Sequence, residues 1–168
     1  MALDVLKSLS RFFRGLKMLI DTHCHLDVAE FDLDRDEVLA HCRAKNISKI
    51  VIPAIEASTW HKVMDLCNKE KGLYPAFGLH PVFIDKHQDS DINKLEVLVK
   101  TQKPVAIGEI GLDFYIKELD QQRQIYFFEA QLEIAKKHEL PVILHVRKAH
   151  DRVLQLLKKI KVKGGFSH

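Results

Sequence analysis

The sequence predicts a parallel α/β fold, and three observations carry this prediction. Short apolar runs alternate with longer polar segments from residue 18 to residue 168. The apolar runs are continuous, which is typical of strands that are buried on both faces of a sheet. The segments between them carry apolar residues at helical spacing. Alternating strands and helices indicate right-handed crossovers between parallel strands.

Six apolar runs define the expected strands. Each run is short, and each is followed by polar residues. In chain order the runs are LID (19–21), KIVIPAI (49–55), LYPAFG (73–78), PVAIGEIG (104–111), PVILHV (141–146) and KGGFSH (163–168).

Two of the intervening helices have a clear apolar face. The first is expected near 118–138, where Ile125, Phe128, Leu132 and Ala135 lie on one side. The next helix repeats this pattern with Val153, Leu156, Leu157 and Ile160.

Two architectures fit this order of elements: an open doubly wound sheet and a closed (β/α)8 barrel. The first run is followed by THCHLD and has no GxGxxG, so the dinucleotide-binding version of the open sheet loses its main support. The six runs start 22 to 37 residues apart. Two further units of about 30 residues each would approach the ~250 residues of a complete barrel. The sequence therefore predicts a TIM (β/α)8-type barrel, of which this chain carries about six strand–helix units.

The chain divides into an extension at residues 1–17 and one partial barrel domain at residues 18–168. The extension carries leucines at helical spacing among basic residues, so a membrane-surface helix or a targeting peptide is the alternative to an accessory segment. There is no apolar run of about 18 residues, and we expect no stable membrane insertion.

Composition sets limits on partners and compartment. The formal net charge of +3 is too small to indicate a nucleic-acid partner, although it is compatible with an anionic substrate. Three cysteines, an odd number without a CxxC motif, argue against a disulfide scaffold, and a reducing cytoplasm is the simplest expectation.

The stretch IDTHCHLD places two histidines two residues apart at the end of the first strand. Side chains alternate across a strand, so His23 and His25 project to one side and Cys24 to the other. Imidazole is a common metal ligand, and such a pair at a strand end can clamp a metal ion. The alternative is two surface histidines, with Cys24 as a packing residue.

Other strand ends carry similar chemistry, and barrel sites form at the C-terminal ends of strands. An unpaired carboxylate in an apolar strand is costly, so a glutamate there indicates function. The remaining candidates are His80 in GLHP, Glu109, Asp113 and Tyr115 in GEIGLDFY, His145 and Arg147 in LHVRKAHD, and His168 in the closing GGFSH. The histidines at 41, 61, 87, 138 and 150 fall on predicted helices or loops and are expected at the surface.

Four imidazoles and one carboxylate exceed the ligands of a single tetrahedral site. A carboxylate can bridge two ions, and Glu109 is the candidate bridge of a two-metal site that activates water. His80 and Arg147 are expected to hold a phosphate. Asp113 is expected to receive a proton or orient a ligand, with helix capping as its alternative. Tyr115 is expected to stack on a base or sugar, with packing as its alternative.

Taken together, these stretches resemble the TatD family of metal-dependent deoxyribonucleases, within the amidohydrolase-like barrels. The matching segments are IDTHCHLD, GLHP, AIGEIGLDFY, LPVILHVRKAHD and GGFSH, in the family's order. The resemblance implies phosphodiester hydrolysis on DNA, with a role in DNA repair or degradation. It implies two divalent ions (Mg, Mn or Zn). The metal ligands that it implies are His23, His25, Glu109, His145 and His168.

The sequence departs from the family pattern in two ways. The first is the extension at residues 1–17. The second is that the family's last two strands, with a late metal-binding Asp, have no counterpart here, so we expect a chain truncated at its C-terminus. Weaker metal binding, impaired activity and self-association through uncovered barrel edges are then expected. The alternatives are another amidohydrolase-like hydrolase acting on an ester, lactone or cyclic amide, or a non-catalytic metal-binding remnant.

Overall fold

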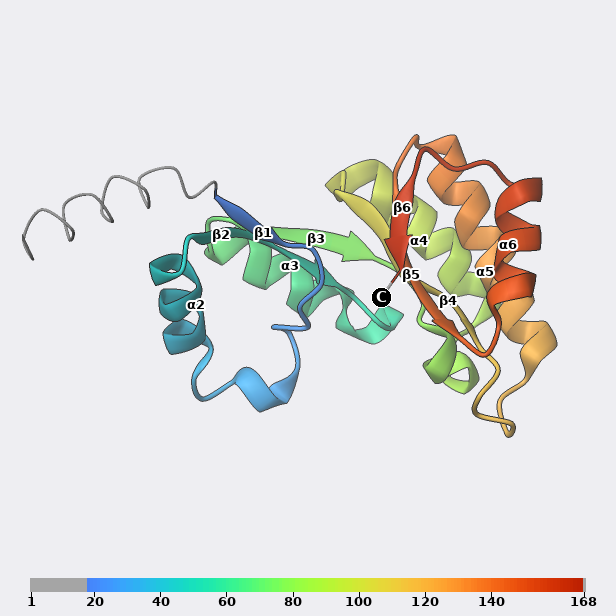
Figure 1. Ribbon diagram of the computed structural model, residues 1–168, viewed down its shortest axis with the longest axis horizontal. Helices are drawn as coiled ribbons and strands as arrows, with labels where there is room; N and C mark the ends of the chain where they lie inside the picture. The colour runs from blue at the N-terminus through green and yellow to red at the C-terminus, as the bar shows by residue number, and fades with distance from the viewer. Residues whose placement is uncertain (1–17, 168) are drawn as a thin grey trace, which may run out of the picture.

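The structure, a computed structural model, describes residues 18–167 and contains one sheet of six parallel strands (Figure 1). Each strand lies beside its neighbour in the sequence, in the order β1 to β6. The predicted α/β fold with six strands of a barrel is confirmed. The proposed extension at residues 1–17, together with His168, lies outside the described residues. The strands are β1 (Leu19–Asp21), β2 (Ile47–Pro53), β3 (Leu73–Phe77), β4 (Ala106–Asp113), β5 (Val142–Arg147) and β6 (Gly165–Ser167).

Helices connect consecutive strands and cover one face of the sheet. Crossovers between neighbouring parallel strands are right-handed, which places every connecting helix on the same side. Figure 1 shows α2 and α3 beside β1–β3, and α5 and α6 beside β4 and β5. The α-helices are α2 (Arg35–Ala44), α3 (Trp60–Lys69), α4 (Asp89–Gln102), α5 (Gln121–Lys137) and α6 (His150–Lys159), and the 3₁₀ helices are η1 (Ala29–Phe31), η2 (Ala57–Thr59) and η3 (Pro81–Lys86).

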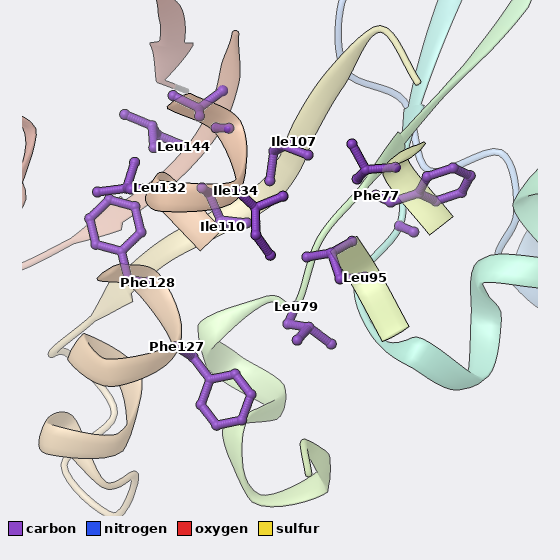
Figure 2. Packing of buried hydrophobic residues seen from close by; sticks show 14 of the residues in the cluster. Phe77, Leu79, Leu95, Ile107, Ile110, Phe127, Phe128, Leu132, Ile134 and Leu144 are labelled. Atoms are coloured by element: carbon purple, nitrogen blue, oxygen red, sulfur yellow. The ribbon is translucent and has the colours of Figure 1, made fainter. Parts of the chain in front are cut away.

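The core lies between the helices and the sheet, with α5 at its centre. Phe128 and Leu132 of α5 are fully buried and lie near Ile110 of β4 (Figure 2). Burial of one such side chain contributes about 1.5–3 kcal/mol. α5 begins where the Asp120 carboxylate accepts a hydrogen bond from the Arg123 amide at 3.0 Å. This packing holds β4, the strand that carries Glu109, in a fixed position.

Burial differs between the centre and the edges of the sheet. Every residue of β4 is buried, as the continuous apolar run predicts. In β1, by contrast, Leu19 and Ile20 are 52% and 56% exposed. Within residues 18–167, β1 pairs only with β2 and β6 only with β5, so their outer sides have no neighbouring strand. The strands therefore form an arc with two open edges, and the expectation of full burial is wrong for β1.

The ladder between β3 and β4 is short. These strands pair only at Ala76 with Ala106 and at Phe77 with Ile107. β4 continues to Asp113, paired with β5 as far as Arg147. Beyond Phe77, the chain that leads to the predicted site is therefore not held by strand pairing with β4.

No helix among the described residues combines the length and the apolar character needed to cross a membrane.

Candidate metal centre

One buried carboxylate is surrounded by four imidazoles. Glu109 lies in β4 and is 1% exposed. Its Oε2 atom lies 3.1 Å from His23 Nε2 and 3.3 Å from His25 Nε2. Its Oε1 atom lies 3.4 Å from His145 Nδ1 and 3.5 Å from His80 Nε2. Each carboxylate oxygen therefore faces a separate pair of imidazoles.

The two histidines of the HxH stretch leave β1 on the same side. Their Nε2 atoms are 3.0 Å apart, and both face Glu109. Between them, Cys24 packs against the hydrophobic core, and burial raises the pKa of its thiol to about 11. Cys24 is thus a packing residue, and its protonated thiol is a poor metal ligand.

Two glycines allow the strands to approach closely around the centre. A Cβ atom on Gly78 would lie 2.7 Å from the carbonyl carbon of Gly108, which is closer than real Cβ atoms come. Gly111 has a φ of +145°, and a Cβ there would lie 2.0 Å from the His145 carbonyl oxygen. These positions explain the glycines of GLHP and GEIG, since larger residues would push His80 and His145 away from Glu109.

His80 is buried at the start of η3, three residues beyond the end of β3. Its Nδ1 atom accepts a hydrogen bond from the Val82 amide at 3.1 Å. A neutral imidazole with an accepting Nδ1 carries its proton on Nε2. His80 Nε2 faces Glu109, so this imidazole presents a donor there and not a lone pair.

Asp113 lies beside His145 at the end of β4. Its Oδ2 atom is 3.0 Å from His145 Nε2, and its Oδ1 atom accepts hydrogen bonds from the Tyr115 and Ile116 amides at 3.0 and 3.2 Å. The carboxylate therefore contacts an imidazole and caps the following loop. These contacts are compatible with both alternatives raised for Asp113, orientation of a ligand and capping, and the orienting role stays a prediction.

Arg147 and Tyr115 form the outer rim of this region. Both side chains are exposed, and the Arg147 guanidinium carbon lies 3.7 Å from the centre of the Tyr115 ring. Arg147 Nη1 also lies 4.0 Å from Asp113 Oδ2. The rim thus offers a cation stacked on an aromatic ring next to the buried cluster.

Charge in the cluster is distributed unevenly. Burial alone would raise the pKa of Glu109, but hydrogen bonds from the imidazoles outweigh burial and hold this pKa well below 4.5. Burial would lower the pKa of His25, yet the Glu109 carboxylate raises it above 6.5. Glu109 and Asp113 likewise raise the pKa of His145 against burial. For His80, burial outweighs the effect of the Glu109 carboxylate and lowers the pKa of the imidazole.

The donor set fits divalent metal ions. Among the described residues, two groups of three have ligand atoms within 4.8 Å of one another: His23, His25 and Glu109, and His80, Glu109 and His145. Both groups share Glu109. Imidazole nitrogens and a carboxylate that stays ionised are ligands of Zn²⁺ and Mn²⁺. His168, the fifth ligand that the resemblance implies, lies outside the described residues.

Sequence reasoning placed His87 at the surface, and this is wrong. His87 is 1% exposed, and its Nε2 atom lies 2.9 Å from the His80 carbonyl oxygen. The 3₁₀ helix η3 folds back at this point, so that His87 packs under His80 and against Phe127. No local pattern in the sequence shows this turn.

Three further buried polar residues near the centre were not found from the sequence. Asp27 is buried, burial raises its pKa, and its Oδ1 atom has no hydrogen-bond partner among residues 18–167. Gln124 and Gln131 are buried on α5 and bond to the backbone of Asp113 and Leu79. For the two glutamines, the signal in the sequence was their position on the apolar face of the predicted helix.

Comparison with known families matches most of the chain. The family model described as TatD related DNase matches residues 20–168. The uncharacterized metal-dependent hydrolase YjjV of Escherichia coli (strain K12) is 39% identical over 142 residues, covering 83% of this chain and 55% of YjjV. The 3'-5' ssDNA/RNA exonuclease TatD of Erwinia billingiae is 32% identical over 140 residues, covering 83% of this chain and 54% of the exonuclease.

A solved structure shows the same fold. The crystal structure of YjjV, a TatD homologue from Escherichia coli K12, superposes with a TM-score of 0.81 at 38% identity. The match covers 84% of this chain and 56% of YjjV. The chain therefore spans about half the length of these relatives.

Proposed function

The chain belongs to the family of TatD-related DNases, and from this premise we propose that it hydrolyses phosphodiester bonds of DNA with two divalent metal ions. The observation that carries the proposal is that the two carboxylate oxygens of Glu109 face different pairs of imidazoles. One carboxylate oxygen faces His23 and His25, and the other faces His145 and His80. A carboxylate with one oxygen toward each of two donor groups suits a bridge between two ions.

The proposed ligands follow from these contacts. His23, His25 and Glu109 Oε2 would hold one ion, and Glu109 Oε1 with His145 Nδ1 would hold the second. When bound, such ions lower the pKa of water and neutralise charge on a phosphodiester. The imidazole-rich donor set favours Zn²⁺ or Mn²⁺ over Mg²⁺. His168 stays a proposed ligand on the resemblance alone.

Asp113 would keep His145 ready to bind metal. An ionised carboxylate 3.0 Å from Nε2 accepts the Nε2 proton, which leaves a lone pair on Nδ1, the atom that faces Glu109. Metal-binding histidines commonly have such a carboxylate partner. The loop amides of Tyr115 and Ile116 hold Asp113 from the other side, and with His145 they keep its pKa low despite burial.

His80, Arg147 and Tyr115 would bind the substrate. His80 presents a proton on Nε2, which suits an anionic phosphate oxygen better than a metal ion. The Arg147 guanidinium is a bidentate donor to phosphate, and its stacking on Tyr115 keeps it at the rim. Tyr115 offers an exposed ring on which a base of single-stranded DNA can stack.

The relatives support a nucleic-acid substrate. The name of the Erwinia billingiae relative includes single-stranded DNA and RNA exonuclease activity. A barrel hydrolase acting on an ester, lactone or cyclic amide often uses a carboxylated lysine as its bridge. Here Glu109 supplies that group, which favours the nuclease.

Release of nucleotides from DNA tests the proposal. We expect the protein to shorten an end-labelled single-stranded oligonucleotide in Mn²⁺, and EDTA to abolish this reaction because the ligands then hold no ion. Denaturing electrophoresis measures the products, and heat-inactivated protein is the control. Hydrolysis of ester or lactone substrates with intact DNA would support the alternative enzyme. Mn²⁺ binding without hydrolysis of any substrate would support the non-catalytic remnant.

Metal affinity should depend on pH. The pKa values of His25 and His145 lie above 6.5, so protons compete with metal up to a pH above that value, while Glu109 stays ionised. Affinity for each ion should therefore rise with pH, by at most about tenfold per unit, and level off above the pKa of its imidazole. Titration with Mn²⁺ at fixed ionic strength measures this. Equal affinity at pH 6 and pH 8 would contradict the assignment of these imidazoles as ligands.

We also propose a cytoplasmic location and a role in DNA repair or degradation. The three cysteines are free thiols, which suits a reducing compartment. Self-association is proposed through the open edges of β1 and β6, where Met18, Leu19 and Ile20 are exposed.

A further inference from the structure

Two buried glutamines on α5 each bind a backbone segment next to the proposed metal centre. Gln124 and Gln131 are both 1% exposed. They are seven residues apart, which is two helical turns, so they lie on the same face of α5. A buried amide side chain requires hydrogen-bond partners, and each of these two finds them on the main chain of a strand end.

Gln131 binds both polar backbone groups of Leu79. Its Oε1 atom accepts a hydrogen bond from the Leu79 amide at 2.7 Å, and its Nε2 atom donates to the Leu79 carbonyl at 3.2 Å. Nε2 also donates to the Phe127 carbonyl, one turn earlier in α5, at 3.1 Å. Leu79 directly precedes His80, so Gln131 fixes the peptide that carries this imidazole.

Gln124 binds Asp113 in the same way. Its Oε1 atom accepts a hydrogen bond from the Asp113 amide at 2.8 Å, and its Nε2 atom donates to the Asp113 carbonyl at 3.0 Å. The Asp113 side chain meets His145. The two glutamines therefore act on the two imidazoles that face Oε1 of Glu109, which are His80 and, through Asp113, His145.

The geometry of β3 explains why a side chain is needed at Leu79. The Pro75 carbonyl accepts from the Val105 amide at 3.0 Å, so it faces β4. Backbone groups alternate along a strand, and those of Phe77 and Leu79 therefore face the same way. Among the described residues, pairing with β4 ends at Phe77 and Ile107. The Leu79 groups lie beyond the last pair, and Gln131 takes the place of the missing strand.

The end of β4 likewise needs a side-chain partner for its backbone, because β3 no longer runs beside it. The Phe114 amide donates to the Arg147 carbonyl at 2.8 Å, so residue 114 faces β5 and Asp113 faces away from it. That direction leads toward β3, which has already ended. Gln124 supplies the partner there. The two glutamines together replace the ladder where β3 and β4 separate.

We propose that Gln124 and Gln131 are positioning residues of the metal centre, which substitute for strand pairing between β3 and β4. In this role Gln131 sets the place of His80, and Gln124 sets the place of Asp113 and, through it, of His145. The proposal deepens the function proposed above and rests on it for the metal. The amide contacts themselves can be tested without metal.

The test uses Gln131→Met and Gln124→Met, because methionine has a similar length but no amide. Hydrogen exchange of the backbone amides by NMR, without metal, should accelerate about tenfold at Leu79 in Gln131→Met and at Asp113 in Gln124→Met. Neither variant should change the other's amide. Binding of Mn²⁺ alone, measured by EPR of the free ion, should weaken by about tenfold in Gln124→Met, because Asp113 orients the proposed ligand His145. It should stay within about twofold in Gln131→Met, because His80 is not among the proposed ligands.

Leu132→Ala and Gln122→Met are the controls on the same helix. Leu132 is fully buried and its loss lowers stability by packing alone, whereas Gln122 is exposed. Both controls should keep Mn²⁺ affinity within about twofold under conditions where every variant is folded. Unchanged exchange at Leu79 and Asp113, or an equal loss of Mn²⁺ binding in Leu132→Ala, would overturn the proposal. If the unmodified protein binds no Mn²⁺, the proposed function fails, and the exchange experiment still decides whether the glutamines hold these strand ends.

Discussion

Replacement of Glu109 by glutamine should lower Mn²⁺ affinity by at least about 100-fold and DNA hydrolysis by at least about 1,000-fold, which is about 4 kcal/mol. Glutamine has the same shape but no charge, and its NH₂ group cannot ligate a cation. Both proposed ions would lose a ligand, because each oxygen of Glu109 faces its own pair of imidazoles. Titration with Mn²⁺ and the oligonucleotide assay measure the two effects.

Glu118→Gln is the matched control for this variant. Glu118 is an exposed glutamate in the loop that follows β4, so its loss removes the same charge without touching the cluster. We expect it to bind Mn²⁺ and hydrolyse DNA as the unmodified protein does. A Glu109→Gln protein that kept full metal affinity would show that the imidazoles hold the ion without the carboxylate.

Asp113→Asn should lower DNA hydrolysis by about 100-fold or more through the tautomer of His145. The loop amides of Tyr115 and Ile116 need an acceptor at Oδ1, so the asparagine NH₂ group would face His145 Nε2. The imidazole must then accept at Nε2 and carry its proton on Nδ1, the atom that faces Glu109. That atom would have no lone pair for a metal ion.

The control for this variant is Asp120→Asn, at the start of α5. Asp120 caps the helix by accepting from the Arg123 amide, and asparagine caps as well as aspartate does. Its activity should remain within about twofold. If Asp113→Asn behaved like Asp120→Asn, Asp113 would be a loop cap and would not orient His145. The ¹⁵N chemical shifts of the His145 ring would report the tautomer directly.

Much of the fold could be predicted from local patterns. The apolar runs locate all six strands, with boundaries that differ by a few residues, and the helix expected near 118–138 spans Gln121–Lys137. β4 gives the clearest case, because a strand buried on both faces contains mostly residues that tolerate burial, and the carboxylates of Glu109 and Asp113 are the exceptions. These exceptions indicated the site.

The exposure of β1 could not be predicted in the same way. Leu19 and Ile20 form an apolar run like that of β4, yet both are more than half exposed because β1 has a neighbour on one side only within the described residues. Burial depends on the neighbours of a strand, which local composition does not specify.

The candidate site was predictable where side chains follow strand ends, and not where the chain turns back. His23 and His25 converge on one oxygen because side chains alternate along an extended chain. His87 reaches the His80 carbonyl only through the turn of η3, and Gln131 reaches Leu79 across 52 residues of sequence. Such contacts depend on tertiary packing, which a periodic pattern does not encode.

Diffraction from Mn²⁺-soaked crystals, with anomalous differences collected for manganese, shows whether two ions share the Glu109 carboxylate. We expect two peaks in the unmodified protein, one between His23, His25 and Glu109 Oε2 and one between His145 Nδ1 and Glu109 Oε1, and neither peak in crystals of Glu109→Gln. Peaks that lie away from Glu109, or that persist unchanged in Glu109→Gln, would contradict this expectation.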